Sequence, residues 1–144
     1  MKNLSSNWKE RSWAKINEQK DNGLIRDCLF YKNLTDSIIH VYRRNGDFRI
    51  YNCNGCCKRW FFTFNGAECK TPRAIDGTLY MRKGVGHNIH CVRHIEGHCD
   101  KIRKGPVRVG FNVGNCSGYG NANAYTGWNS NSRLFVEEVP RPQP

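Results

Sequence analysis

The chain has 144 residues, a length that suits one domain and leaves no room for two independent cores. Hydrophobic residues make up 38% of the sequence and aromatic residues 12%, which excludes a long disordered tract. The net charge of +11 favours an acidic partner such as nucleic acid, anionic lipid or a sulfated polysaccharide. No apolar run approaches the roughly 18 residues of a membrane-spanning helix, so membrane insertion is not expected.

Eight of the residues are cysteines, a content typical of a disulfide-bonded extracellular domain. The segment 1–13 is polar and charged and lacks the apolar core of a signal peptide. We therefore expect the sequence to be the mature, C-terminal piece of a longer secreted protein.

Residues 1–23 predict a polar lead-in that ends in a turn at Asp21-Asn22-Gly23. Beyond it, apolar residues follow the two-residue period of strands. An Asn-Gly pair, the strongest short-range hairpin signal, separates two predicted pairs of strands. The first pair is 37–44 and 47–53 around Asn45-Gly46, and the second is 58–64 and 67–69 around Asn65-Gly66.

Further strands are predicted along the rest of the chain. Val107, Val109, Phe111 and Val113 alternate with polar residues or glycine, which indicates a half-buried strand. Residues 117–130 predict a loop rich in glycine and asparagine, and residues 141–144 a proline-rich tail. The remaining predicted strands are 25–32, 74–83, 88–95 and 132–139.

Apolar residues show no sustained helical spacing, so long helices are not expected. Many short strands with turns every 8–12 residues are typical of a β-sandwich or barrel. The sequence therefore predicts an all-β, antiparallel β-sandwich over residues 24–140.

Zinc binding and disulfide bonding are alternative explanations of the cysteines. Cys53 and Cys56 have zinc-ligand spacing, and residues 87–99 are rich in histidine and cysteine. However, there is no second CxxC, and the adjacent Cys56 and Cys57 point to opposite faces of a strand, which suits two bridges. We expect disulfides and no metal, with the pairing left open. The cysteines are Cys28, Cys53, Cys56, Cys57, Cys69, Cys91, Cys99 and Cys116.

Catalytic residues are not expected either. Cys91 beside His90 is the nearest approach to a nucleophile and base, but neighbours in a strand face apart and no third orienting group is evident. The sequence predicts a binding protein without enzymatic activity or cofactor.

Several strings resemble the C-terminal noncollagenous domain of the collagen triple helix repeat-containing protein family. Ser12-Trp13 lies at the family's distance before Cys28. Two positions depart from the family: Arg11 stands where the family has a cysteine, and Cys91 stands where a cysteine is not expected. Cys91 is then a candidate to take over an orphaned partner or to pair between chains. The strings are CCKRWFFTFNGAEC (56–69), HNIH (87–90), IEGHC (95–99), VGNC (113–116) and TGWNSNSRLFVEEVP (126–140).

The resemblance implies a secreted protein in which a short collagen stem precedes a globular head. The head is similar to the jelly roll of tumour-necrosis-factor and complement globular-head domains, which form trimers. The resemblance also implies roles in matrix remodelling and in Wnt signalling, through Wnt ligands and Frizzled receptors. A trimeric head would bring three collagen chains together and present three copies of each surface.

Aromatic residues at 60–64 occupy both faces of the predicted strand. Apolar groups on both faces need two covers, so we expect one face to meet the core and the other a subunit interface. A loop over Phe61 is the alternative. Trp128 is either an anchor beneath its loop or an exposed contact residue. The expected interface residues are Trp60, Phe61, Phe62 and Phe64.

Four basic residues lie within eight positions and are the predicted polyanion-binding cluster. They are Lys101, Arg103, Lys104 and Arg108. Arginine and lysine bind sulfate groups through charge-assisted hydrogen bonds, so sulfated glycosaminoglycan is the expected ligand. A solvated basic face is the alternative.

Asn33 and Asn115 each begin an Asn-x-Ser/Thr sequon. Asn33 is the better candidate for glycosylation because it lies between two predicted strands, whereas Asn115 precedes Cys116.

Two other functions remain open. One is a monomeric lectin-like sandwich that binds glycans through Trp128 and its loop. The other is a basic, zinc-stabilised module that binds nucleic acid, the less expected partner.

Overall fold

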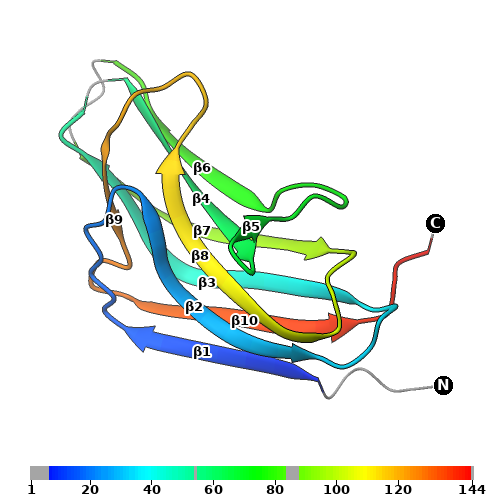
Figure 1. The fold of residues 1–144 in the computed structure, drawn as a ribbon. Coiled ribbons are helices and arrows are strands. Elements are labelled where there is room, and N and C mark those ends of the chain that lie inside the picture. The colour runs from blue at the N-terminus through cyan, green and yellow to red at the C-terminus, as the bar shows by residue number, and fades with distance from the viewer. Residues whose placement is uncertain (1–6, 54, 84–87, 144) are drawn as a thin grey trace.

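The computed structural model describes residues 7–53, 55–83 and 88–143 and shows two antiparallel β-sheets packed face to face (Figure 1). Sheet A has the order β1-β10-β3-β7, with β9 also paired to β3, and sheet B has the order β2-β8-β4-β5, with β6 also paired to β4. The all-β sandwich is confirmed, and its strand order is compatible with the predicted jelly roll. The strands are β1 (Trp8–Ala14), β2 (Gly23–Lys32), β3 (Ile38–Tyr51), β4 (Cys56–Phe64), β5 (Ala67–Glu68), β6 (Asp76–Met81), β7 (Asn88–Cys99), β8 (Gly105–Asn115), β9 (Asn123–Thr126) and β10 (Asn131–Val139).

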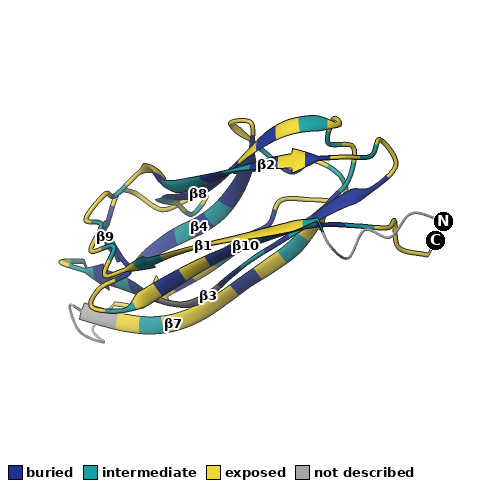
Figure 2. Cartoon of the chain, turned by 90° about the horizontal axis from the view of Figure 1, so that it is seen from below, coloured by how far each residue is buried: buried dark blue, intermediate teal, exposed yellow. Residues whose placement is uncertain are grey.

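The core lies between the two sheets and is built from alternate residues of each strand. In β8, Val107, Val109, Phe111 and Val113 are all buried, as their spacing predicts. Exposed and buried residues also alternate along β10 (Figure 2). In the described part of the chain, no helix is long and apolar enough to cross a membrane.

The two Asn-Gly pairs have different structures. At Asn65-Gly66 both residues have positive φ, 53° and 88°, and the pair joins β4 to β5 as the predicted hairpin. The hairpin predicted at Asn45-Gly46 is wrong, because β3 continues through it with an irregularity in its register to β7. β3 pairs with β7 on one side and with β10 and β9 on the other, and this pairing overrides the local preference for a turn.

Part of the predicted lead-in is a strand of the sandwich. β1 pairs along its whole length with β10, from Trp8 opposite Glu137 to Ala14 opposite Asn131. Its residues are mostly exposed, so an alternating apolar pattern is absent from the sequence. The sandwich therefore includes one strand, β1, before the expected boundary at residue 24.

Side chains of the N-terminal segment also cover the free edge of β2. Every second residue donates a hydrogen bond to a backbone carbonyl of that edge. Unpaired strand edges promote aggregation, and this cover protects one of them. The bonds run from Asn7 to Tyr31 (3.1 Å), from Lys9 to Leu29 (2.9 Å) and from Arg11 to Asp27 (3.1 Å).

Six of the eight cysteines form disulfides, in the pairs Cys53–Cys56, Cys57–Cys116 and Cys69–Cys99. Cys28 and Cys91 carry no bridge, which differs from the expectation that all eight are bonded. Cys28 is fully buried, and Arg11, which stands where the resemblance led us to expect a cysteine, bonds the carbonyl of the adjacent Asp27. The arginine thus occupies a position next to Cys28, and Cys28 remains a thiol.

Candidate functional site

The aromatic run of β4 lies mainly in the core. Trp60, Phe62 and Phe64 point between the sheets and are buried, because β4 is a central strand of sheet B. Phe61 points outward and is half-buried, with the guanidinium of Arg59 over its ring at 4.6 Å. Of the four rings expected at a subunit interface, three belong to the core of one chain, and only Phe61 faces outward.

A different set of aromatic rings lies on the outer face of sheet A. Trp8 of β1 stacks on Phe135 of β10 at 5.4 Å, and Phe135 stacks on Tyr42 of β3 at 4.6 Å. We name these three residues the aromatic row. Trp8 is 54% exposed, and exposed apolar groups on a sheet face are typical of interaction surfaces. The sequence does not reveal the row because its members come from three separate strands.

Ion pairs flank the aromatic row. His40 lies between two carboxylates, with Nδ1 2.7 Å from Glu137 Oε1 and Nε2 2.5 Å from Glu96 Oε2. Hydrogen bonds from His94 and then from His40 lower the pKa of Glu96. The outer face of sheet A therefore combines stacked rings with paired charges, as interfaces with an apolar centre and a polar rim do.

The basic residues predicted to bind polyanions lie mostly at one end of the sandwich. Lys101, Arg103 and Lys104 are exposed in the turn from β7 to β8. Arg108 lies farther along on β8, where its Nη1 pairs with Asp27 Oδ2 at 2.9 Å. The ion pair partly neutralises Arg108. Among the described residues, the cations of the predicted cluster without an ion-pair partner are therefore the three in the turn.

A second loop brings further cations to this end. The Cys69–Cys99 disulfide joins the start of loop 69–73 to the end of β7, and the backbone N–H of Asp100 donates to the carbonyl of Thr71 at 2.8 Å. Sequence reasoning does not place the cations of loop 69–73 at this end, because only the disulfide pairing shows which residues lie next to them. We name the resulting set of exposed cations the basic end: Lys70, Arg73, Lys101, Arg103 and Lys104.

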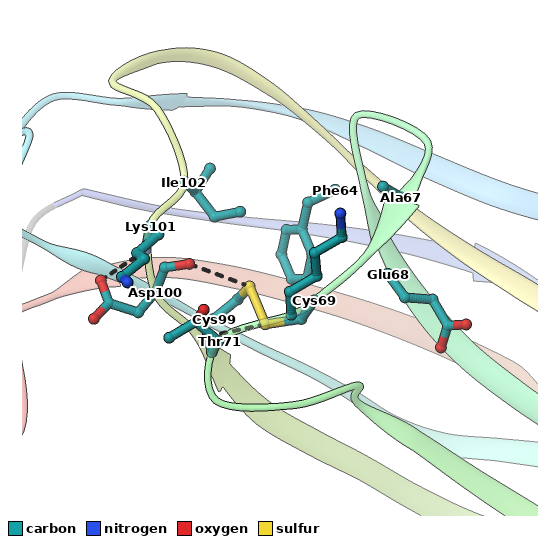
Figure 3. Close-up of a pocket in the computed structure, with 10 residues that line it drawn as sticks. Phe64, Ala67, Glu68, Cys69, Thr71, Cys99, Asp100, Lys101 and Ile102 are labelled. Carbon is teal, nitrogen blue, oxygen red and sulfur yellow. Dashed lines mark hydrogen bonds between the residues drawn. A yellow bond between two sulfur atoms is a disulfide. The ribbon is translucent and has the colours of Figure 1, made fainter.

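A pocket of about 280 Å³ opens between the two loops of the basic end (Figure 3). The Cys69–Cys99 disulfide, the ring of Phe64 and Ile102 supply apolar walls. Its other lining residues are Ala67, Glu68, Lys70, Thr71, Asp100 and Lys101.

Trp128 is exposed by 45% and does not anchor the core, so the structure favours the second of its two predicted roles. Its ring lies 5.0 Å from that of His90, whose Nδ1 is 2.8 Å from Asp47 Oδ2. The turn that carries it is fixed by a bond from Gly127 N–H to the carbonyl of Asp47 at 2.8 Å. Trp128 is therefore held on the surface by an ordered turn.

The two sequons have different surroundings. Asn33 is exposed in the turn between β2 and β3. The Asn115 side chain accepts a hydrogen bond from Lys58 Nζ at 2.7 Å and donates one to Asn121 at 2.7 Å. Its neighbour Cys116 is bridged. Both asparagines are exposed, but the amide of Asn115 is engaged in two side-chain hydrogen bonds.

The zinc-spaced pair is not a metal site in the structure, because Cys53 and Cys56 are bonded to each other. Within the residues that the structure describes, no group of three or more His, Cys, Asp or Glu side chains is arranged to hold a metal. His87, the first residue of the histidine-rich stretch, lies outside the described residues.

Over residues 3–136 the sequence matches a protein family described as CTHRC1, C-terminal domain. The matched segment runs from before β1 into β10, so it contains both sheets and all three disulfides. It agrees with the resemblance carried by the sequence strings. Since the match covers nearly the whole chain, this protein belongs to the CTHRC1 C-terminal domain family, the non-catalytic globular domain of collagen-like proteins.

Proposed function

We propose that this domain is the non-enzymatic head of a secreted collagen-like protein, which assembles as a homotrimer and binds sulfated glycosaminoglycan. The observation that carries the polyanion role is the basic end, where one disulfide and one backbone hydrogen bond bring two cationic loops together. Lysine and arginine ammonium and guanidinium groups bind sulfate through charge-assisted hydrogen bonds. The net charge of +11 adds long-range attraction for a polyanion.

Self-association is assigned to the outer face of sheet A. The aromatic row supplies exposed apolar area, and the paired charges around His40 supply a polar rim. Three copies of the basic end in one assembly multiply weak contacts with a long polyanion into avidity.

An extracellular location belongs to the same proposal. The three disulfides support it, because such bonds persist in oxidising compartments. Glycosylation at Asn33 and partners of the Wnt and Frizzled type, which the family resemblance implies, are part of the proposal as well.

Heparin chromatography tests the polyanion role. Replacement of Lys101, Arg103 and Lys104 by glutamate should make the protein elute at lower salt, because it removes three of the five cations. The matched control replaces Arg82, Lys83 and Arg93, which are also exposed, and changes the net charge by the same amount. Equal elution of the two variants would show that only net charge matters and would refute a specific basic end.

Glycan binding through Trp128 is a second candidate, favoured by its exposure on an ordered turn. Trp residues are prominent among binding hot spots, and an ordered turn lowers the entropy lost on binding. Screening wild type and Trp128→Ala on a glycan array tests it, since only ligands lost by the variant would support this role.

A further inference from the structure

The pocket at the basic end has an apolar interior. Phe64 is buried, and the disulfide between Cys69 and Cys99 and the half-buried Ile102 complete the apolar walls (Figure 3). Its volume of about 280 Å³ is at the lower limit of small-molecule pockets, which suits one ring-sized group.

The acidic residues that line the pocket are paired with basic groups, whereas its lysines are exposed. Glu68 pairs with Arg59, and Asp100 Oδ1 accepts a hydrogen bond from the backbone N–H of Lys101 at 2.7 Å and lies 3.3 Å from Arg141 Nη2. Both acids thus have basic partners of their own. Lys70 and Lys101 are exposed at the pocket, next to the other cations of the basic end. An incoming group therefore meets positive charge around an apolar interior.

We propose that this pocket binds an aryl sulfate, the side chain of a sulfated tyrosine on a partner protein. The proposal rests on the polyanion-binding role of the basic end and names a second ligand for it. The ring would pack against Phe64 and the disulfide, because aromatic rings make favourable contacts with other rings and with sulfur. The sulfate would accept hydrogen bonds from the ammonium groups of Lys70 and Lys101.

Other anions fit the pocket less well. A sugar sulfate carries a polar ring, which gains little from apolar walls, and an aspartate or glutamate side chain carries no ring at all. Tyrosine sulfation occurs in the secretory route, and the three disulfides are compatible with that route.

Calorimetry with p-cresyl sulfate as the probe tests the proposal. The wild-type protein should bind it about tenfold or more tightly than p-cresol or inorganic sulfate, because each of these lacks one half of the interaction. Equal binding of all three compounds, or no binding of p-cresyl sulfate, would overturn the proposal.

Two variants locate the binding. Ala67 lines the pocket and is exposed, so Ala67→Trp should fill the pocket and abolish probe binding without disturbing the core. Lys104→Ala, a cation of the basic end outside the pocket lining, should keep probe binding. Should Ala67→Trp fail to fold, the double replacement of Lys70 and Lys101 by Met serves instead. Probe binding that survives in the pocket variant would place the ligand elsewhere.

Heparin elution separates this proposal from the function on which it rests. Ala67→Trp keeps every cation and should elute from heparin at the wild-type salt concentration. If the wild-type protein does not bind p-cresyl sulfate but elutes from heparin as expected, the pocket proposal alone is refuted. If the wild-type protein binds the probe but replacing the cations of the basic end does not change its elution from heparin, the glycosaminoglycan role alone is refuted.

Discussion

The guanidinium of Arg43 lies inside the core, 4.6 Å from the centre of the Phe111 ring. The ring of Phe48 is also close, with its centre 4.9 Å from the guanidinium. Nη2 donates to Ser132 Oγ at 2.8 Å, whereas Nη1 has no hydrogen-bond partner among the described residues. The two rings offset part of the desolvation of this charge through cation–π attraction, but no carboxylate of the described chain pairs with it.

Replacing Arg43 by Met, together with Ser132→Ala to remove the hydroxyl left without its donor, should stabilise the domain. We expect the free energy of unfolding at pH 7 to rise by about 1–4 kcal/mol, the range found when buried ionic groups give way to apolar ones. Urea unfolding measures it, with Ser132→Ala alone as the control. A double variant less stable than this control would show that the cation is a net stabilising group.

The difference in stability between the double variant and wild type should also depend on pH. Burial lowers the pKa of Arg43 to about 9, so between this value and the ordinary arginine pKa the unfolded chain binds a proton that the folded chain lacks. Wild-type stability therefore gains from this group as pH rises above 9, and the advantage of the double variant should shrink by about 1.4 kcal/mol between pH 7 and pH 10. A constant difference over this range would mean that Arg43 stays protonated in the fold.

Glu138 should stabilise the domain at neutral pH and lose that effect in acid. Burial by itself raises the pKa of Glu138, but a hydrogen bond from the Ser37 hydroxyl and backbone N–H bonds from Asn33 and Leu34, both 2.8 Å, outweigh it and lower the pKa below 4.5. The stabilisation is thus present above the ordinary pKa and disappears as pH falls through the lower, folded-state value.

Glu138→Gln should therefore be less stable than wild type at pH 7 by about 1.5–3 kcal/mol, the usual contribution of a hydrogen bond to a charged group. The difference should narrow toward pH 3. Thermal unfolding at pH 7, 5 and 3 measures this, with Asp36→Asn, an exposed acid in the turn whose backbone N–H groups bond Glu138, as the control. Parallel pH profiles for wild type and Glu138→Gln would contradict the assignment.

Introducing a cysteine at position 11 should create a fourth disulfide. Arg11 bonds the carbonyl of Asp27, and the adjacent Cys28 is a buried thiol. A bridge between positions 11 and 28 would close a loop of similar length to those whose closure contributes about 3 kcal/mol. Mass measurement after thiol labelling should find one free thiol in Arg11→Cys, where wild type has two.

The control for this bridge is Ser12→Cys. Position 12 is next to position 11 on β1, and neighbouring residues of a strand point to opposite faces of the sheet. It should show three free thiols. Three free thiols in Arg11→Cys as well would mean that β1 does not hold position 11 close enough to Cys28.

The elements that the sequence predicts correctly are those with a local cause. The strand around Val109 alternates because one face is buried, and Asn65-Gly66 forms its turn because β4 ends at Phe64 and the two-residue β5 pairs back on it. Asn45-Gly46 has the same local preference, but partners on both sides keep β3 extended. β1 escapes prediction because its partner β10 is more than a hundred residues away and its own residues are exposed.

The same distinction between local causes and distant partners holds for the basic end and for the aromatic row. Lys101, Arg103 and Lys104 are neighbours in the chain, so composition alone marks them. Lys70 and Arg73 join them through the Cys69–Cys99 bridge and the backbone hydrogen bond from Asp100 to Thr71, and the spacing of eight cysteines does not determine their pairing. The sequence predicts the interface rings on β4 because aromatic residues there occupy successive positions, whereas the rings on the outer face of sheet A come from strands that only the fold brings together.

Trp8→Ser should weaken the trimer without unfolding the domain. Trp8 begins the aromatic row, contacts Phe135 from outside and is more than half exposed, so its loss removes apolar contact area but leaves the core intact. Light scattering should give about three times 16.6 kDa for wild type and a concentration-dependent fall toward a single subunit for the variant. Trp128→Ser, which replaces another exposed tryptophan outside the row, should keep the wild-type mass. A wild-type protein with the mass of one subunit would contradict self-association. A monomer produced only by Trp128→Ser would show that the interface does not involve the aromatic row.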